Sequence, residues 1–216
     1  LAGEETFIRS MATRGHSGGL ALAVPAAIRL FDAVGYDPVI IETVGVGQVE
    51  VDVAGTADTT VVVVTPGWGD AVQANKAGLL EVADIFVVNK ADRPGAKDAR
   101  RDLELMLDLG HISGLNDKNE FRPPIIMTNA LDGEGTNEVW KHIKEHGEHL
   151  HSSGQLEQRQ SNRIHLEIMN RLNGVIGGIA SSVLETEAGR ELLKSVTSLE
   201  VSPSEAAKQL AATVLK

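Results

Sequence analysis

Short, continuous apolar runs alternate along this chain with longer segments whose apolar residues recur every three or four positions. A continuous Val- and Ile-rich run, without alternation of apolar and polar positions, is typical of a strand buried on both faces of a parallel sheet. The runs predict five strands, at residues 7–10, 38–42, 60–65, 85–89 and 125–128.

The segments between these runs have the periodicity of helices. They predict helices over residues 25–34, 70–82, 96–109 and 136–150. Strands that alternate with helices are joined by crossovers, which place helices on both faces of the sheet. We therefore expect an α/β fold: a doubly wound, mostly parallel sheet.

The pattern changes after residue 151, where a single apolar stripe runs along a long predicted helix. Its members are Ile164, Ile168, Leu172, Val175, Ile179 and Val183. Gly174, Gly177 and Gly178 weaken the prediction that this helix is unbroken. Further helices are predicted over 187–196 and after Ser202-Pro203-Ser204-Glu205, which combines a cap, a first-turn proline and an acid.

These patterns predict a domain over residues 1–151 and a helical extension over 152–216, with a hinge at HSSGQ (151–155). An extension with one apolar stripe has no core of its own. It must pack on the α/β domain or on a second subunit, and a homodimer arm is one of these two expectations.

Composition and charge exclude several classes of protein. The chain has 216 residues, no cysteine and a net charge of −10, and the whole acidic excess lies in residues 1–151. An acidic domain without basic runs argues against binding to nucleic acid or to an anionic membrane. The sequence holds no apolar stretch long enough to span a bilayer and no cysteine for a disulfide, which favours a cytoplasmic protein.

Two of the predicted strands end in loops whose residues suit a nucleotide. Glu42 and Gly45 follow the run at 38–42, where a carboxylate is able to hold Mg²⁺ and a glycine amide to approach a γ-phosphate. Asn89, Lys90 and Asp92 follow the run at 85–89. A carboxylate at position 92 is able to accept two hydrogen bonds from the ring N–H and amino group of guanine, a donor pair that adenine lacks.

A third loop, Asn129-Ala130-Leu131, follows the run at 125–128. A small residue there allows a backbone N–H to reach the guanine oxygen. Each loop alone has an ordinary structural reading, as a polar turn or a helix cap. The three in series predict a guanine-nucleotide site at the carboxyl ends of the strands.

The chain resembles the MeaB/ArgK-type GTPases, which are SIMIBI-class P-loop G proteins that act as chaperones of adenosylcobalamin-dependent acyl-CoA mutases such as methylmalonyl-CoA mutase. The resemblance covers nearly the whole chain. The matching stretches are FIRSMATRGHSGGLA (7–21), ETVGVGQVEVDVAG (42–55), PGWGDAVQANKAG (66–78), VADIFVVNKAD (82–92) and RPPIIMTNALDGEGTNEVW (122–140).

The resemblance implies roles for particular residues. Glu42 is the acid near Mg²⁺ and Gly45 lies by the γ-phosphate. The guanine site comprises Asn89, Lys90, Asp92, Asn129, Ala130 and Leu131. Asp70, Gln73 and Lys76 occupy positions that couple the nucleotide state to the mutase partner. The implied cofactors are GTP or GDP with Mg²⁺.

One motif of the family is absent from these 216 residues. No G-x-x-x-x-G-K-[ST] phosphate-binding loop occurs in the sequence. In the family this loop comes before the first matching stretch, so we expect it upstream of Leu1. We also expect this chain alone to bind nucleotide feebly and not to turn over GTP.

Three other functions remain as alternatives: a nickel-insertion GTPase, a transport-system kinase, or a non-catalytic dimerisation module. The lack of cysteine argues against the first, because such sites generally use Cys and His clusters. His142, His146 and His149 have a spacing able to bind metal, but Glu145 and Glu148 among them indicate a solvated helix face.

Overall fold

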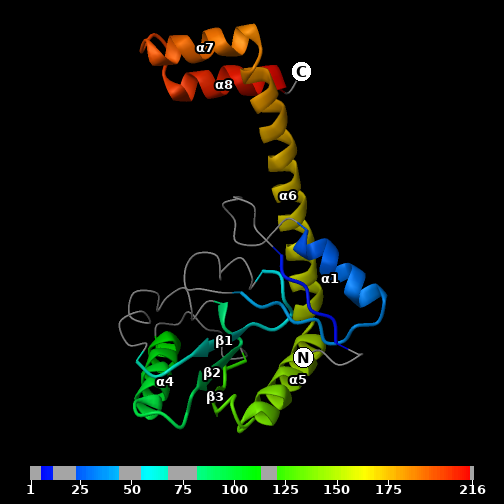
Figure 1. Ribbon diagram of the computed structural model, residues 1–216, viewed down its shortest axis with the longest axis vertical. Helices are drawn as coiled ribbons and strands as arrows, with labels where there is room; N and C mark the ends of the chain where they lie inside the picture. The colour runs from blue at the N-terminus through cyan, green and yellow to red at the C-terminus, as the bar shows by residue number, and fades with distance from the viewer. Residues whose placement is uncertain (1–5, 12–22, 44–54, 68–81, 113–120, 215–216) are drawn as a thin grey trace. The chain divides into compact units, whose positions relative to one another are not determined.

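The computed structural model describes residues 6–11, 23–43, 55–67, 82–112 and 121–214 (Figure 1). The chain divides into two compact units, Leu1–Arg163 and Ile164–Lys216. These limits differ from the expected boundary at 151/152, which stays a prediction.

The first unit is built on a parallel sheet of three described strands in the order β1-β2-β3. They are β1 (Val61–Val64), β2 (Ile85–Asn89) and β3 (Ile125–Thr128). Val64 pairs with Val88, and Asn89 pairs with Thr128, so the polar ends of β2 and β3 meet at the same edge. The predicted strands at 60–65, 85–89 and 125–128 are confirmed.

Helices cover both faces of this sheet, α4 (Ala96–Ile112) on one and α5 (Thr136–Ser153) on the other (Figure 1). Side chains of β2 alternate between the two faces because successive residues of a strand point in opposite directions. Phe86 and Val88 pack with the α4 residues Leu103, Met106 and Leu107.

On the opposite face, Ile85 and Val87 pack with Ile126 and with α5 through Val139 and Ile143. Both Ile85 and Phe86 are fully buried, and burial of each such side chain stabilises the fold by about 1.5–3 kcal/mol. The doubly wound α/β fold is confirmed.

Two of the five predicted strands are wrong. Residues 7–10 and 38–42 are not strands in the structure. An extended segment becomes a strand only where a neighbour pairs with its backbone, and no backbone hydrogen bond joins 38–42 to a described strand. Residues 7–10 instead lie beside α1 (Val24–Ala33), where the rings of Phe7 and Phe31 are 5.5 Å apart.

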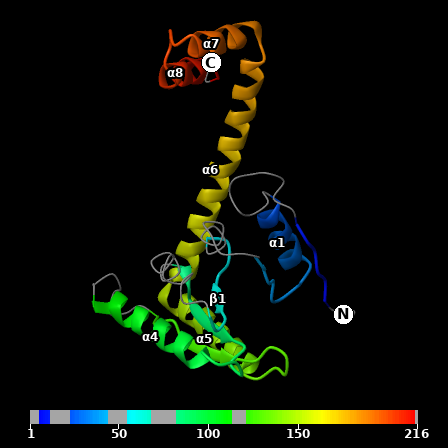
Figure 2. The same cartoon turned by 60° about the vertical axis from the view of Figure 1, so that its left-hand side comes forward.

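The remaining helices follow the predictions closely. They are α6 (Gln155–Leu184), α7 (Glu187–Thr197) and α8 (Pro203–Val214), and Figure 2 shows α6 as one continuous helix. Gly154, with φ 73°, separates α5 from α6 within the predicted hinge. The glycines at 174, 177 and 178 do not interrupt α6, since each costs a helix only about 1 kcal/mol relative to alanine. The predicted Ser202 cap is confirmed, because its Oγ accepts a hydrogen bond from the Glu205 amide at 3.2 Å.

The predicted helix at 70–82 falls almost wholly outside the described residues. Within the described part of the chain, no helix is both long enough and apolar enough to cross a bilayer.

Candidate functional site

The carboxyl ends of β2 and β3 bring two of the predicted loops together through one amide side chain. Asn89 Oδ1 accepts a hydrogen bond from the Ala130 amide at 3.1 Å and another from the Thr128 hydroxyl at 3.3 Å. The Thr128 carbonyl in turn accepts from the Ala91 amide at 2.9 Å. Asn89 is therefore a bracing residue that joins the loop after β2 to the loop after β3.

The turn after β2 presents Asp92 to solvent. Lys90 has a left-handed backbone, with φ 61°, which is uncommon for a residue other than glycine and is often found at functional sites. The Arg93 amide donates to the Lys90 carbonyl at 3.0 Å and closes the turn around Asp92. Asp92 is exposed, and no described residue pairs with its carboxylate. Both oxygens of Asp92 are thus free to accept hydrogen bonds from a ligand.

The loop after β3 is held by its own side chains. Asp132 accepts from the Asn129 side-chain amide at 2.8 Å and from the Glu134 backbone amide at 3.0 Å. The Asn129 side-chain oxygen accepts from the Leu131 amide at 3.3 Å. Asn129 therefore shapes this loop, while Leu131 is 95% exposed and available to a ligand or partner.

Gly135 closes the same loop at a position that excludes a side chain. Its φ is +78°, and a Cβ there would lie 2.2 Å from the Met127 carbonyl oxygen. The sequence DGEG therefore sets the return of the chain from β3 to α5. Asp132 and Gly135 contribute to the shape of this loop. They were not among the predicted site residues, although a DG-x-G run after a strand is a turn signal.

The predicted phosphate end of the site has less support. Glu42 is exposed and lies in the extended segment that does not join the sheet. No described contact connects it to the loops after β2 and β3. Gly45, Asp70, Gln73 and Lys76 lie outside the described residues.

The described ligand groups bear on the predicted Mg²⁺ site. No group of three His, Asp or Glu side chains in that part of the chain is arranged to hold a metal ion. Nucleotide-bound Mg²⁺ needs only one or two protein carboxylates besides phosphate and water. The single carboxylate of Glu42 fits that need.

A charged network at the opposite end of the sheet was not foreseen. Asp84, which precedes β2, accepts two hydrogen bonds from Arg159 of α6, at 2.8 and 3.0 Å. It also accepts from the Thr60 amide at 2.8 Å and lies 3.3 Å from His146 Nε2. The other ring nitrogen of His146 is 2.8 Å from the Thr59 hydroxyl.

These contacts govern the ionisation of Asp84. Burial on its own would raise the pKa of this carboxyl, but the hydrogen bonds from His146, Arg159 and the Thr60 amide outweigh burial and lower the pKa from 3.8 to about 2. The hydrogen bond to Asp84 correspondingly raises the pKa of Arg159. Asp84 is the charged centre of a structural network that joins α5 and α6 to the sheet.

The expectation of a solvated His142–His149 face is wrong for His146, which is 1% exposed. Its ring lies between Asp84, Thr59 and the ring of Phe121, whose centroid is 5.0 Å away. The available signal was the recurrence of Val139, Ile143, His146 and Leu150 in steps of four, three and four residues, which places His146 on the buried side of α5.

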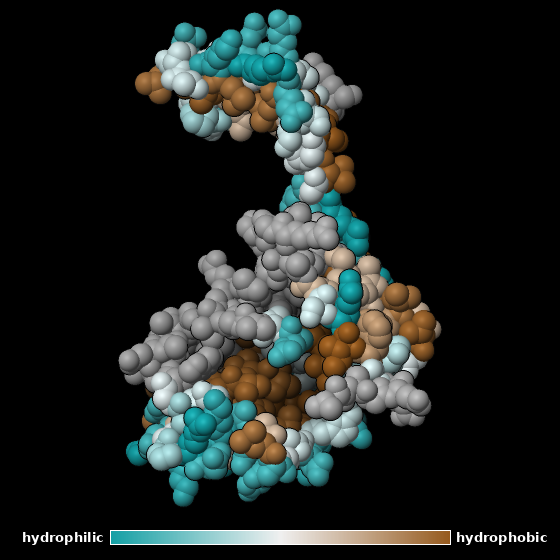
Figure 3. Space-filling model, in the orientation of Figure 1, coloured by the Kyte–Doolittle hydropathy of each residue, from teal (hydrophilic) through white to brown (hydrophobic). Residues whose placement is uncertain are grey.

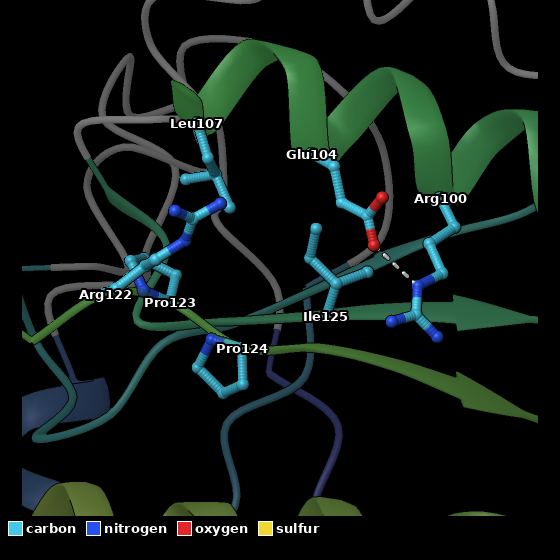
Figure 4. A pocket seen from close by; sticks show the side chains of 7 residues that line it. All are labelled: Arg100, Glu104, Leu107, Arg122, Pro123, Pro124 and Ile125. Atoms are coloured by element: carbon cyan, nitrogen blue, oxygen red, sulfur yellow. Dashed lines mark hydrogen bonds and ion pairs between the residues drawn. The ribbon is translucent and has the colours of Figure 1, made fainter. Parts of the chain in front are cut away.

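The cavity drawn in Figure 4 lies between α4 and the approach to β3, and none of its lining residues belongs to the loops after β2 and β3. Its volume is about 180 Å³, below the roughly 300–1,000 Å³ of typical ligand pockets. Its two arginines are already paired, Arg100 with Glu104 at 2.8 Å and Arg122 with Asp108 at 2.7 Å. The cavity therefore offers no uncompensated cation to an anionic ligand.

Comparison with known proteins connects these loops to one family. The model of the methylmalonyl-CoA mutase-associated GTPase MeaB family matches residues 2–181. A protein of Pyrococcus abyssi named as a GTPase is 46% identical over 207 residues, which are 94% of this chain and 62% of that protein. The GTPase ArgK of Escherichia coli is 37% identical over 156 residues, 72% of this chain and 46% of ArgK.

Two further proteins are similar to this chain. A mouse protein named methylmalonic aciduria type A homolog, mitochondrial, is 36% identical over 69% of this chain and 36% of its own length. The crystal structure of a LAO/AO transport system kinase has a TM-score of 0.57 at 29% identity, covering 89% of this chain and 62% of that one. This chain spans about three fifths of the Pyrococcus relative. It belongs to the family of methylmalonyl-CoA mutase-associated GTPases, MeaB.

Proposed function

We propose that the intact protein binds GTP, with guanine recognised by the loops after β2 and β3, and hydrolyses it. The observation that carries this proposal is the bracing of the two loops by Asn89 beside an exposed, unpaired Asp92 carboxylate. A carboxylate held in a fixed turn accepts hydrogen bonds from the two donors on the edge of guanine. Opposite adenine, which lacks this donor pair, the carboxylate is left without partners. The neighbouring loop, whose Ala130 amide is held by Asn89, presents the exposed Leu131 side chain and completes the base site.

Mg²⁺ would be held at the phosphate end by Glu42, and Gly45 would lie by the γ-phosphate. A bound Mg²⁺ supplies charge neutralisation of the phosphate oxygens. The chain's own part is to position the base through Asn89 and Asp92 and the cation through Glu42. A phosphate-binding loop is not part of this sequence, so these roles are proposed for the intact protein.

The proposed partner is an adenosylcobalamin-dependent acyl-CoA mutase of the methylmalonyl-CoA mutase type. GTP binding and hydrolysis would gate loading or protection of the mutase cofactor, with Asp70, Gln73 and Lys76 as the coupling residues. The family description, which associates these GTPases with that mutase, supports the partner. A pull-down of the purified mutase with a non-hydrolysable GTP analogue, with GDP and without nucleotide tests it. We expect capture to depend on the nucleotide, and capture that is equal in all three conditions would contradict the proposal.

The stripe on α6 supports a homodimer. Ile164, Ile168, Leu172, Val175 and Ile179 are each between 45% and 61% exposed, and Figure 3 shows apolar atoms along the flank of α6. An exposed apolar stripe of this length marks an interaction surface. Replacement of Ile168 and Val175 by Asp should convert a dimer to a monomer in light scattering, whereas replacement of the exposed Arg171 by Ala should not.

A further inference from the structure

One carboxylate ties together the two ends of the loop after β3. Asp132 Oδ2 accepts a hydrogen bond from the Asn129 side-chain amide at 2.8 Å, and its Oδ1 accepts from the Glu134 backbone amide at 3.0 Å. The backbones of Asn129 and Glu134 are also paired, since the Asn129 amide donates to the Glu134 carbonyl at 3.0 Å. Both oxygens of Asp132 are therefore used inside the loop.

The contact with Asp132 also decides which way the Asn129 side-chain amide points. A carboxylate only accepts hydrogen bonds, so the nitrogen of this amide faces Asp132 and its oxygen faces the other way. The oxygen there accepts a hydrogen bond from the Leu131 amide at 3.3 Å. Loss of the Asp132 carboxylate would remove the group that selects this orientation, and with it the support of the backbone at Leu131.

Described contacts connect this loop to the turn that carries Asp92. The Ala130 amide donates to Asn89 Oδ1 at 3.1 Å. The Thr128 carbonyl accepts from the Ala91 amide at 2.9 Å, and Ala91 comes directly before Asp92 in the sequence. A change in the shape of the loop after β3 therefore reaches the proposed base site through described contacts alone.

The same loop contains a second acid that differs from Asp132 in its contacts. Both Asp132 and Glu134 are exposed. The Glu134 carboxylate has no hydrogen bond or ion pair within the ranges that the structure describes. Replacement of either acid removes one negative charge from the loop, but only replacement of Asp132 removes two hydrogen bonds. Because Asp132 is exposed, its loss should open the loop locally and leave the sheet folded.

We propose that Asp132 is a positioning residue for nucleotide binding: by orienting Asn129 it holds the loop after β3 in the shape that receives the base. This inference rests on the proposed function. Asp132 does not contact the nucleotide, because both of its oxygens are occupied within the loop. Its effect differs from that of Asp92. A loop that is already ordered lowers the cost of binding either purine, whereas Asp92 selects between the two.

The test compares Asp132→Ala and Asp132→Asn with the matched control Glu134→Ala in the intact protein. In Asp132→Ala the loop must be ordered on binding, so we expect the Kd for GTP to rise by roughly tenfold. The preference for GTP over ATP and the kcat for GTP should stay within about twofold of the unaltered protein. Glu134→Ala should leave all three quantities within about twofold. Asp132→Asn retains one acceptor oxygen and should lie between Asp132→Ala and the unaltered protein.

Amide hydrogen exchange reports on the loop independently of the nucleotide. In Asp132→Ala we expect exchange at Leu131 and Glu134 to accelerate by roughly tenfold, with no change at residues 85–89 of β2. Glu134→Ala should not accelerate exchange at Leu131. Unchanged exchange in β2 would show that the weaker binding comes from the loop and not from a general loss of structure.

Three results would overturn the proposal. The first is a Kd for GTP that is the same in Asp132→Ala and Glu134→Ala. The second is exchange at Leu131 that does not accelerate in Asp132→Ala. The third is a loss of the preference for GTP over ATP in Asp132→Ala, which would make Asp132 a group that reads the base itself. Failure of the proposed function has a different signature, because the unaltered protein would then show no preference for GTP, while the difference in exchange between the two variants would remain.

Discussion

Asp84 and Arg159 form a two-pronged ion pair, with nitrogen–oxygen distances of 2.8 and 3.0 Å, between the residue that precedes β2 and the first turn and a half of α6. They are 75 residues apart in the sequence. His146 and the Thr60 amide occupy the remaining sides of the same carboxylate. One side chain therefore fixes two helices and two strand starts.

Replacement of Arg159 by Ala should lower the free energy of unfolding by about 3 kcal/mol, because it removes the guanidinium that pairs with the largely buried charge of Asp84. Urea unfolding of the intact protein measures this, with Arg171→Ala as the exposed control. The double variant that also carries Asp84→Ala should lose less than the sum of the two single losses. Additive losses would show that the two side chains do not interact.

Stability should fall as the pH is lowered from about 4 to about 2. The pKa of Asp84 is lowered to about 2 in the folded protein, against about 3.9 in an unfolded chain. A lowered carboxyl pKa stabilises the fold above the unfolded value, and this stabilisation, about 2 kcal/mol, is lost as the pH falls through the folded value.

Asp84→Asn removes this titration and serves as the control. The difference in unfolding free energy between the unaltered protein and Asp84→Asn should shrink between pH 5 and pH 2. A difference that stays constant over that range would contradict the lowered pKa.

Gly135→Ala should disrupt the loop after β3, because the new methyl group would meet the Met127 carbonyl oxygen. Gly133→Ala is a matched control, since Gly133 has a similar φ of +82° but its nearest neighbour, Thr136 Oγ1, is 3.9 Å from a built Cβ. We expect a cost of about 1 kcal/mol for Gly133→Ala from backbone strain alone and about 3 kcal/mol or more for Gly135→Ala. Thermal unfolding gives both values, and equal costs would show that the loop relaxes around the methyl group.

The central part of the fold was predictable from local pattern. Continuous runs such as IFVVN identify β2, because a strand buried on both faces needs no alternation. The same reasoning failed at residues 38–42, where Ile40 is 83% exposed. Whether an apolar run becomes a strand depends on a hydrogen-bonded neighbour, which local sequence does not specify.

The candidate site was likewise predictable from the sequence only in part. Asn89 and Asp92 were identified because they follow a buried strand, and the structure joins the Asn89 loop to Ala130. The side chain of Asn129 is used within its own loop, and its place in the guanine site stays a prediction. The contacts of Asp84 with His146 and Arg159 were missed because they join distant segments, and no periodicity within one helix reveals a partner on another element.

The central claim is that Asp92 selects guanine, and one measurement tests it directly. Dissociation constants for GTP and ATP are determined for the intact protein and for Asp92→Asn, with the exposed Asp98→Asn of α4 as the control. The account predicts that Asp92→Asn reduces the preference for GTP over ATP by about a hundredfold or more, while Asp98→Asn leaves it unchanged. A preference for GTP that is the same in Asp92→Asn as in the unaltered protein would contradict the account.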